Sequence, residues 1–264
     1  MGRLIPGLLM VVLWLLLLLL APPVFFWLVI TVGAVIALGE YFRMISTAPG
    51  SGSKALAIGI CSLPVAAAFS GSATAVFIGG YLGLLGLVFL VLSFYTRFDD
   101  VLAFLTSAGF ATFYISICSA HLVLIRFLPD GAFWLLLLTA ITAGSDTGAY
   151  YAGRAFGKTK LCPNISPGKT INGAIGGILA AVITAVVLAC FLLPEVNSLK
   201  LALTSAVLSG VGIAGDLTES IIKRGTGIKD SGTILGGHGG LLDRIDSLLL
   251  TAPLLYALLY FGVL

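Results

Sequence analysis

Long runs of hydrophobic residues dominate this chain, and most of its charged residues fall between them. Nine such runs cover residues 4–20, 24–38, 55–70, 73–94, 101–125, 133–151, 171–193, 201–222 and 247–263. A helix rises about 1.5 Å per residue, so most of these runs are long enough to cross the roughly 30 Å of hydrocarbon in a bilayer. The pattern predicts an all-α polytopic integral membrane protein with about nine transmembrane helices.

Composition and charge placement agree with a membrane protein and suggest its orientation. Of 264 residues, 59% are hydrophobic and 9% are charged, whereas a soluble domain has about 25% charged residues. If the N-terminus is cytoplasmic, all of the 14 Lys and Arg residues except Arg126 and Lys200 lie on the cytoplasmic side. Cytoplasmic loops carry an excess of Lys and Arg, so the sequence predicts a cytoplasmic N-terminus. Two of these basic loops also carry candidate chemistry, and without them the bias is weaker.

The two halves of the chain differ in their polar content. Residues 1–130 read as a scaffold of about five helices, in which Glu40 and Arg43, and likewise Arg97, Asp99 and Asp100, are expected to be solvated charges near helix ends. Residues 131–264 read as the catalytic region, with about four helices and two polar cytoplasmic loops, 152–170 and 223–240. The four cysteines lack the paired spacing of a metal site or a disulfide framework. No internal repeat supports an inverted-repeat transporter.

The stretch "GIAGDLTESIIKRG" places polar groups on one stripe of a predicted helix. Asp216, Ser220, Lys223 and Arg224 follow at spacings of four, seven and eight residues, which share a helix face. A carboxylate within a membrane helix is costly unless it meets a cation, so Asp216 is a candidate functional residue. The alternative is an Asp–Lys pair that locks two helices together.

The stretch "LLDRIDS" adds two carboxylates, Asp243 and Asp246, on one helix face. Like charges this close repel each other unless a positive charge lies between them. Magnesium prefers oxygen ligands and suits such a site when substrate phosphates complete its shell. Arg244 could instead neutralise one carboxylate in a purely structural pair.

The segment between these stretches, "GTGIKDSGTILGGHGG", joins Lys229 and Asp230 to a run of glycines. Glycine lets backbone N–H groups approach an anion closely, so this segment could cradle phosphates. Glycine-rich turns are more often simple connectors. By itself, His238 is more typical of a hydrogen-bonded loop residue than of a metal ligand.

Upstream, "GSDTGAYYAGRAFGKTKLCPNISPGKTING" begins within a predicted helix. Asp146 requires a partner at that depth, whereas the small residues beside it, such as Gly148 and Ala152, favour close helix packing. The stretch "GRAFGKT" is one residue short of the spacing of a nucleotide-cradling P-loop, and "PNISPGKT" has Pro163 where that motif needs its first glycine. Neither stretch is expected to follow a strand, so a P-loop is not predicted. Lys169 and Thr170 lie near a predicted helix start, whose unpaired N–H groups favour phosphate.

Taken together, these residues resemble the signature of the phosphatidate cytidylyltransferases, also called CDP-diacylglycerol synthases. "SIIKRGTGIKDSGTILGGHGGLLDRID" fills each fixed position of Ser-x-x-Lys-Arg, Lys-Asp, His-Gly-Gly and Asp-Arg-x-Asp. "GDLTES", "SDTGAYYAGRAFGK" and "SPGKT" are also similar to that family, so the resemblance covers most of residues 144–247. The chain departs from the family at Asn172, where an acidic residue is usual.

The resemblance implies a reaction in which phosphatidate and CTP give CDP-diacylglycerol and pyrophosphate. This reaction is expected to depend on Mg²⁺, with one or two cations bound at the site. It also implies a homodimer in the inner membrane with its active site facing the cytoplasm, acting on membrane lipid and not on nucleic acid. The expected catalytic residues are Asp216, Lys223, Asp243 and Asp246, with metal held by Asp216, Asp243 and Asp246. The expected substrate-binding residues are Asp146, Ser166, Lys169, Thr170, Ser220, Arg224, Lys229, Asp230, His238 and Arg244.

The residue types suit this reaction independently. A phosphate monoester has its second pKa near about 6, so the attacking phosphate is already largely ionised at neutral pH. No general base is then needed, and the sequence offers no Ser-His-Asp or Cys-His arrangement. Three alternatives remain at this stage: a CTP-dependent lipid kinase, a cation-coupled membrane transporter and a non-catalytic membrane scaffold.

Overall fold

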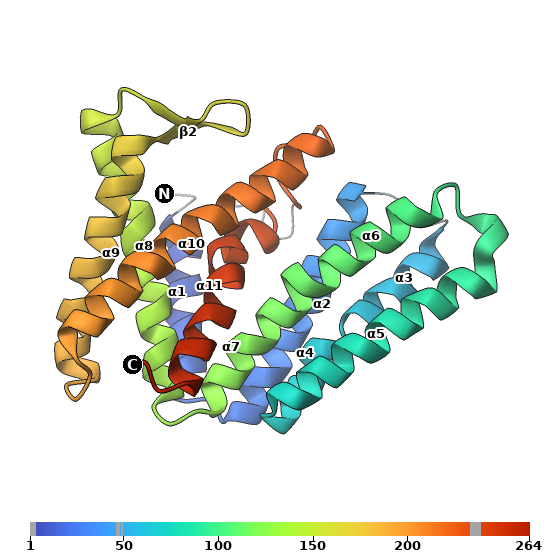
Figure 1. Cartoon of the computed structure of the whole chain (residues 1–264), viewed down its shortest axis with the longest axis horizontal. Helices are drawn as coiled ribbons and strands as arrows, with labels where there is room; N and C mark the ends of the chain where they lie inside the picture. Colours follow the sequence, from blue (N-terminus) through green and yellow to red (C-terminus); the bar gives the residue numbers. More distant parts are fainter. Residues whose placement is uncertain (1–3, 46–47, 49, 233–238) are drawn as a thin grey trace. The chain divides into compact units, whose positions relative to one another are not determined.

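The computed structural model describes residues 4–45, 48, 50–232 and 239–264, and helices make up most of this part of the chain (Figure 1). Each of the nine hydrophobic runs is helical over most of its length, which confirms the predicted all-α class. The chain divides into two compact units. The first contains residues 1–129 and 226–244, and the second contains residues 130–225 and 245–264. The predicted functional division near residue 130 stays a prediction.

The first unit is built from the N-terminal helices. They are α1 (Leu4–Leu19), α2 (Pro23–Ile45), α3 (Ser51–Cys61), α4 (Leu63–Ala67), η1 (Ala68–Ser70), α5 (Ala73–Phe94), η2 (Tyr95–Arg97), α6 (Val101–Ala111), η3 (Thr112–Ile117) and α7 (Cys118–Phe127). Its core contains large side chains such as Phe26, Phe42 and Phe104. The Trp27 indole nitrogen donates to the Val65 and Ala66 carbonyls at 3.1 Å, which joins α2 to α4.

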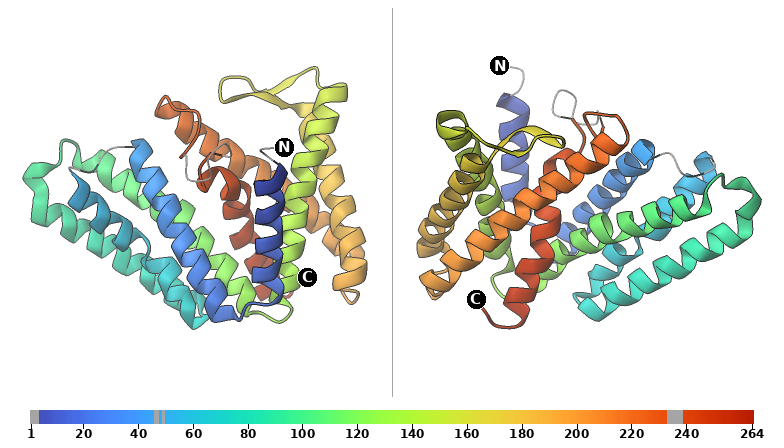
Figure 2. Two further views of the ribbon diagram at one scale, coloured as in Figure 1. Left: turned by 180° about the vertical axis from the view of Figure 1, so that it is seen from behind. Right: turned by 45° about the horizontal axis from the view of Figure 1, so that its top comes forward.

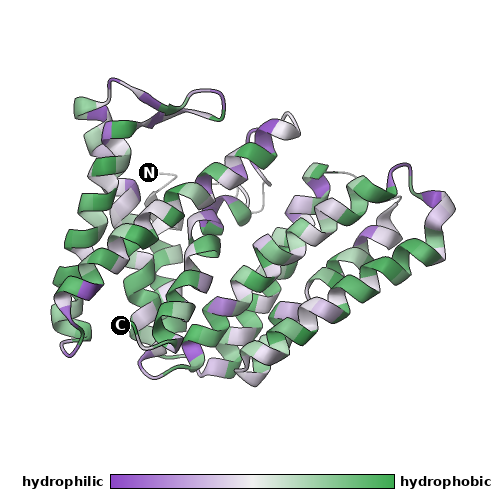
Figure 3. Cartoon of the chain, viewed as in Figure 1, coloured by the Kyte–Doolittle hydropathy of each residue, from purple (hydrophilic) through white to green (hydrophobic). Residues whose placement is uncertain are grey.

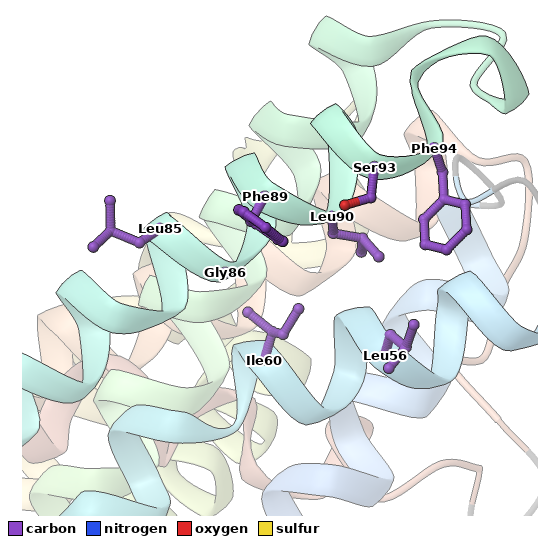
Figure 4. A pocket seen from close by; sticks show the side chains of 8 residues that line it. All are labelled: Leu56, Ile60, Leu85, Gly86, Phe89, Leu90, Ser93 and Phe94. Atoms are coloured by element: carbon purple, nitrogen blue, oxygen red, sulfur yellow. The ribbon is translucent and has the colours of Figure 1, made fainter.

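An apolar groove of about 500 Å³ lies between α3 and α5 in the first unit (Figure 4). Leu56 and Ile60 of α3 face Leu90 and Phe94 of α5 across it. Because its lining is almost entirely apolar, the groove suits contact with hydrocarbon and offers little to a polar ligand.

The second unit consists of α8 (Gly131–Phe156), a β-hairpin of β1 (Lys160–Cys162) and β2 (Ser166–Thr170), α9 (Ile171–Leu192), α10 (Ser198–Gly225) and most of α11 (Leu242–Tyr260). Helices α8 and α9 run side by side in each view (Figures 1 and 2). Gly148 allows this, because a Cβ added there would lie 2.7 Å from the Gly176 carbonyl oxygen of α9. The small residues predicted to serve helix packing do so.

Helix α10 is hydrogen-bonded to α8 and packs closely against α11. The Ser145 and Ser209 hydroxyls are 2.7 Å apart and join α8 to α10. A Cβ added at Gly215 would lie 2.6 Å from the Asp246 carbonyl oxygen, so only glycine lets α10 approach α11 at this point. These contacts set the positions of the carboxylates on α8, α10 and α11.

The helical surfaces are those of an integral membrane protein. Apolar residues cover the helices, whereas the β-hairpin is largely hydrophilic (Figure 3), and side chains such as Phe77 and Phe191 are 75% and 80% exposed. In the described part of the chain, seven helical segments are long and apolar enough to cross a membrane. The other two predicted spans correspond to α1, whose described apolar part is shorter, and α11. The count of nine and the cytoplasmic N-terminus stay predictions.

Candidate active site

An ion pair between the β-hairpin and α10 forms the centre of the polar region in the second unit. Lys169 Nζ, on β2, lies 2.7 Å from Asp216 Oδ2, on α10, and the side chains are 24% and 33% exposed. The expectation that Asp216 needs a cation is confirmed, and the cation comes from the hairpin. This partner could not be identified from the sequence, because the two residues belong to different elements.

The two residues of this ion pair line a cavity of about 310 Å³. The polar and aromatic side chains that line it are Asp146, Tyr150, Lys169, Thr170 and Asp216, and the other lining residues are Ala149, Leu161, Gly168, Gly173, Ala174 and Ile213. The structure thus brings together four of the predicted site residues, which come from α8, β2 and α10. A pocket of this volume that combines carboxylates with a lysine suits a small charged ligand.

Three carboxylates interact electrostatically in the second unit. Asp246, on α11, is affected by the charges of Asp216 and Asp146 and by the Lys223 ammonium. Its Oδ1 also accepts a hydrogen bond from the Ser247 N–H at 2.6 Å. Among the described residues, no group of three or more His, Cys, Asp or Glu side chains already has the close geometry of a metal site.

The predicted polar stripe of α10 is present but makes some unforeseen contacts. The Ser220 hydroxyl donates to Asp216 Oδ1 at 3.5 Å, as the shared face implies. Lys223 Nζ lies 2.7 Å from Glu219 Oε2. Glu219 is only 1% exposed and was not among the predicted site residues, although its spacing of four residues from Lys223 is a signal for such a pair. Arg224 donates to the carbonyl of Ile165, in the turn of the hairpin, at 3.3 Å.

The β-hairpin corrects two expectations about the segment 152–170. "SPGKT" was expected to lie in a loop, but it forms strand β2, which pairs antiparallel with β1. The stretch "PNISPGKT" was expected not to follow a strand, but it comes directly after β1. It still lacks the first glycine of a P-loop, because Pro163 occupies that position. Thr170 is the N-cap of α9, and its Oγ1 accepts a hydrogen bond from the Gly173 N–H at 3.1 Å.

A second polar cluster lies in the first unit, around Asp243 at the start of α11. Asp243 Oδ2 accepts hydrogen bonds from the Ser231 N–H at 3.0 Å, the Ser231 hydroxyl at 2.9 Å and the Gly240 N–H at 2.8 Å. Asp243 therefore holds Ser231 and Gly240, which lie on either side of residues 233–238, by hydrogen bonds to one carboxylate oxygen. Its predicted part in metal binding stays a prediction.

Glu40 is the clearest correction. It was expected to be a solvated charge near a helix end, but it is 0% exposed. Its carboxylate accepts hydrogen bonds from the Leu241 and Leu242 N–H groups at 3.0 and 2.9 Å. Arg43, by contrast, is exposed, as expected. No local pattern could reveal this contact, because Glu40 and Leu241 are about 200 residues apart in the chain.

The other predicted site residues take simpler positions. Ser166 begins β2 and is half-buried, whereas Lys229, Asp230 and Arg244 are exposed. Asn172 is exposed in the first turn of α9. His238 lies outside the described residues.

The amino-acid sequence of this chain is similar to a known family and to several named enzymes. Residues 1–261 match the cytidylyltransferase family. The chain is 41% identical over 179 residues to a phosphatidate cytidylyltransferase of Staphylococcus epidermidis, an alignment that covers 67% of this chain and 68% of the relative. Enzymes with the same name from Bacillus subtilis and Pseudomonas aeruginosa are 40% identical over 163 residues and 46% identical over 140 residues. These two alignments cover 61% and 53% of this chain, and 59% and 52% of the relatives.

Proposed function

The chain belongs to the cytidylyltransferase family, and we propose that it transfers the cytidylyl group of CTP to phosphatidate, which gives CDP-diacylglycerol and pyrophosphate. The observation that carries the proposal is the cavity around Lys169 and Asp216, in a chain that is 41% identical to a phosphatidate cytidylyltransferase. The lipid kinase and the transporter considered from the sequence gain no support from these relatives.

The reaction makes one bond and breaks one. A phosphate oxygen of phosphatidate attacks the α-phosphorus of CTP, and the bond from that phosphorus to the oxygen bridging it to the β-phosphorus breaks, so pyrophosphate leaves with the electron pair. Because the attacking phosphate is already ionised, the protein has to align two anions and reduce their repulsion. Lys169 is the cation at the cavity, and Lys223 and Arg224 follow on α10.

The carboxylates of the second unit fit a hard divalent cation. The side chains of Asp146, Asp216 and Asp246 provide three carboxyl groups that interact electrostatically, while Lys169 pairs directly with Asp216. Oxygen ligands of this kind suit Mg²⁺, with substrate phosphates and water completing the shell. When bound, Mg²⁺ would neutralise the triphosphate oxygens. Asp216 and Asp246 would hold it, and the participation of Asp243 rests on the sequence motif.

The protein's place in the membrane also belongs to the proposal. Phosphatidate is a membrane lipid, whereas CTP is soluble, so the site has to be accessible from both phases. The hydrophilic hairpin next to apolar helices suits that position (Figure 3). We assign the active site to the cytoplasmic face of the inner membrane, and the homodimer implied by the family resemblance is part of the same proposal.

The decisive experiment follows the two ends of CTP separately. Purified protein is incubated with phosphatidate, Mg²⁺ and CTP labelled either in cytosine or in the γ-phosphate. The proposal expects cytidine label in the organic phase and γ-label in pyrophosphate, in equal amounts. It also expects no lipid product when phosphatidate is replaced by diacylglycerol or when EDTA is added. Transfer of the γ-label to lipid would instead identify a kinase.

A further inference from the structure

Glu40 is a buried carboxylate in α2, in the part of the chain that the sequence assigns to the scaffold. Its side chain is 0% exposed, and its helix is otherwise strongly apolar. A buried carboxylate is costly unless its oxygens accept hydrogen bonds. The contacts of Glu40 therefore point to what this residue does.

The carboxylate of Glu40 caps the N-terminus of α11. Oε1 accepts from the Leu241 N–H at 3.0 Å, and Oε2 accepts from the Leu242 N–H at 2.9 Å. The first N–H groups of a helix have no partner within the helix, and the positive end of the helix dipole favours a negative charge. Helix α11 thus begins where Glu40 meets these two N–H groups.

Ser231 connects Glu40 to Asp243. Its hydroxyl lies 3.4 Å from Glu40 Oε2 and 2.9 Å from Asp243 Oδ2. A hydroxyl donates only one proton, and the shorter distance favours donation to Asp243. The Ser231 hydroxyl therefore lies between the carboxylates of Glu40 and Asp243.

Two glycines allow the chain to close around Glu40. A Cβ added at Gly240 would lie 2.6 Å from Glu40 Oε2, and one added at Gly232 would collide with Oε1 of the same carboxylate. Any larger residue at either position would displace Glu40. The described residues on both sides of the segment 233–238 are thus packed against this carboxylate.

From these contacts we infer that Glu40 is a positioning residue for the reaction: it fixes the start of α11, and with it Ser231 and Asp243. This inference rests on the proposed function for its catalytic consequence. Glu40 does not have to touch substrate, because it acts through the backbone N–H groups of Leu241 and Leu242. The N-terminal helices therefore contribute more than a membrane scaffold.

Hydrogen–deuterium exchange tests the structural part without any assay of activity. Glu40→Gln keeps the shape of the side chain but removes its charge and one acceptor oxygen. We expect amide exchange in a peptide covering residues 239–245 to become about tenfold faster or more, since a buried hydrogen bond to a charged group is lost. Ser231→Ala should accelerate exchange in the same peptide. Unchanged exchange in both variants would overturn the inference.

Asp100→Asn is the matched control. Asp100 also caps a helix in the first unit, since its Oδ1 accepts from the Ala103 N–H at 2.9 Å, but it is exposed and caps α6. This variant should leave exchange over residues 239–245 unchanged. Accelerated exchange there in Asp100→Asn would show general loosening of the unit and would count against a specific role for Glu40.

Steady-state kinetics tests the catalytic part. Glu40→Gln should lower kcat by about tenfold or more, on the scale of a lost charged hydrogen bond, and raise the Mg²⁺ concentration for half-maximal activity, with KM for phosphatidate unchanged. Glu40→Asp, which keeps the charge, should recover part of kcat. Wild-type kcat and Mg²⁺ response in Glu40→Gln would overturn the inference. Wild-type protein that transfers no cytidine would instead overturn the proposed function, and the exchange result would still stand.

Discussion

Lys169 Nζ and Asp216 Oδ2 lie 2.7 Å apart, and this pair joins the β-hairpin to α10 within the second unit. Both side chains remain partly exposed and line the same cavity. An ion pair at a ligand cavity can exchange partners, because substrate phosphates compete for the lysine and a metal ion competes for the carboxylate. The pair is therefore expected to be important for turnover as well as for structure.

Replacing Lys169 tests that expectation. Lys169→Met should lower kcat/KM by about 10²-fold, a loss typical of removing one preorganised donor to a developing charge. The measurement is cytidine transfer from labelled CTP at several phosphatidate concentrations. Lys160→Met is the control, because Lys160 is an exposed lysine of the same hairpin. If kcat/KM of Lys169→Met were as high as that of Lys160→Met, Lys169 would have no role in the reaction.

The three hydrogen bonds to Asp243 Oδ2 lead to a prediction for Asp243→Asn. An amide can still accept a hydrogen bond through its oxygen, so the protein should fold and be extracted as the wild type is. It has no negative charge to offer a metal ion, so turnover should be abolished. Pyrophosphate release measures this, and release at the wild-type rate would exclude Asp243 from the mechanism.

Thr170 was predicted to hold phosphate, and in the structure it caps α9. Thr170→Val removes the cap and should lower the free energy of unfolding by about 1 kcal/mol. Thr170→Ser keeps the hydroxyl and should restore most of that loss. Thermal unfolding in detergent compares the variants, and equal melting temperatures for valine and serine would show that the cap contributes nothing.

The contact between α8 and α9 predicts opposite effects for two identical substitutions. Gly148→Ala places a methyl group against the Gly176 carbonyl and should destabilise the protein by about 1–3 kcal/mol. Gly210→Ala, on α10, meets open space and should stabilise its helix by up to about 1 kcal/mol. Melting temperatures should move in opposite directions, and a shift of the same sign would contradict the packing described here.

Asn172 lies in the first turn of α9, at the position where the resemblance to the family leads us to expect an acidic residue. Asn172→Glu should stabilise the protein by about 0.3–1 kcal/mol, because a negative charge favours the N-terminal end of a helix. The gain should shrink at high salt, which screens exposed charges. Asn172→Gln has a similar size without the charge and should show no gain. A gain that is independent of salt would point to another cause.

The sequence by itself determined the class of the protein and pointed to four of the residues that line the cavity around Lys169. Hydrophobic runs identify membrane helices because a helix in lipid satisfies its own backbone hydrogen bonds. The small residues around Gly148 indicate a close helix contact for a similarly local reason. The need of Asp216 for a cation also follows from its position in an apolar helix, whatever the rest of the chain does.

Only the tertiary structure decided which residues meet. Lys169 rather than a neighbour on α10 pairs with Asp216, and Glu40 contacts Leu241 from about 200 residues away. The hairpin escaped prediction because its strands are only three and five residues long and their burial does not alternate along the chain. Helical periodicity describes one element at a time, whereas the partner of a buried charge depends on how separate elements pack.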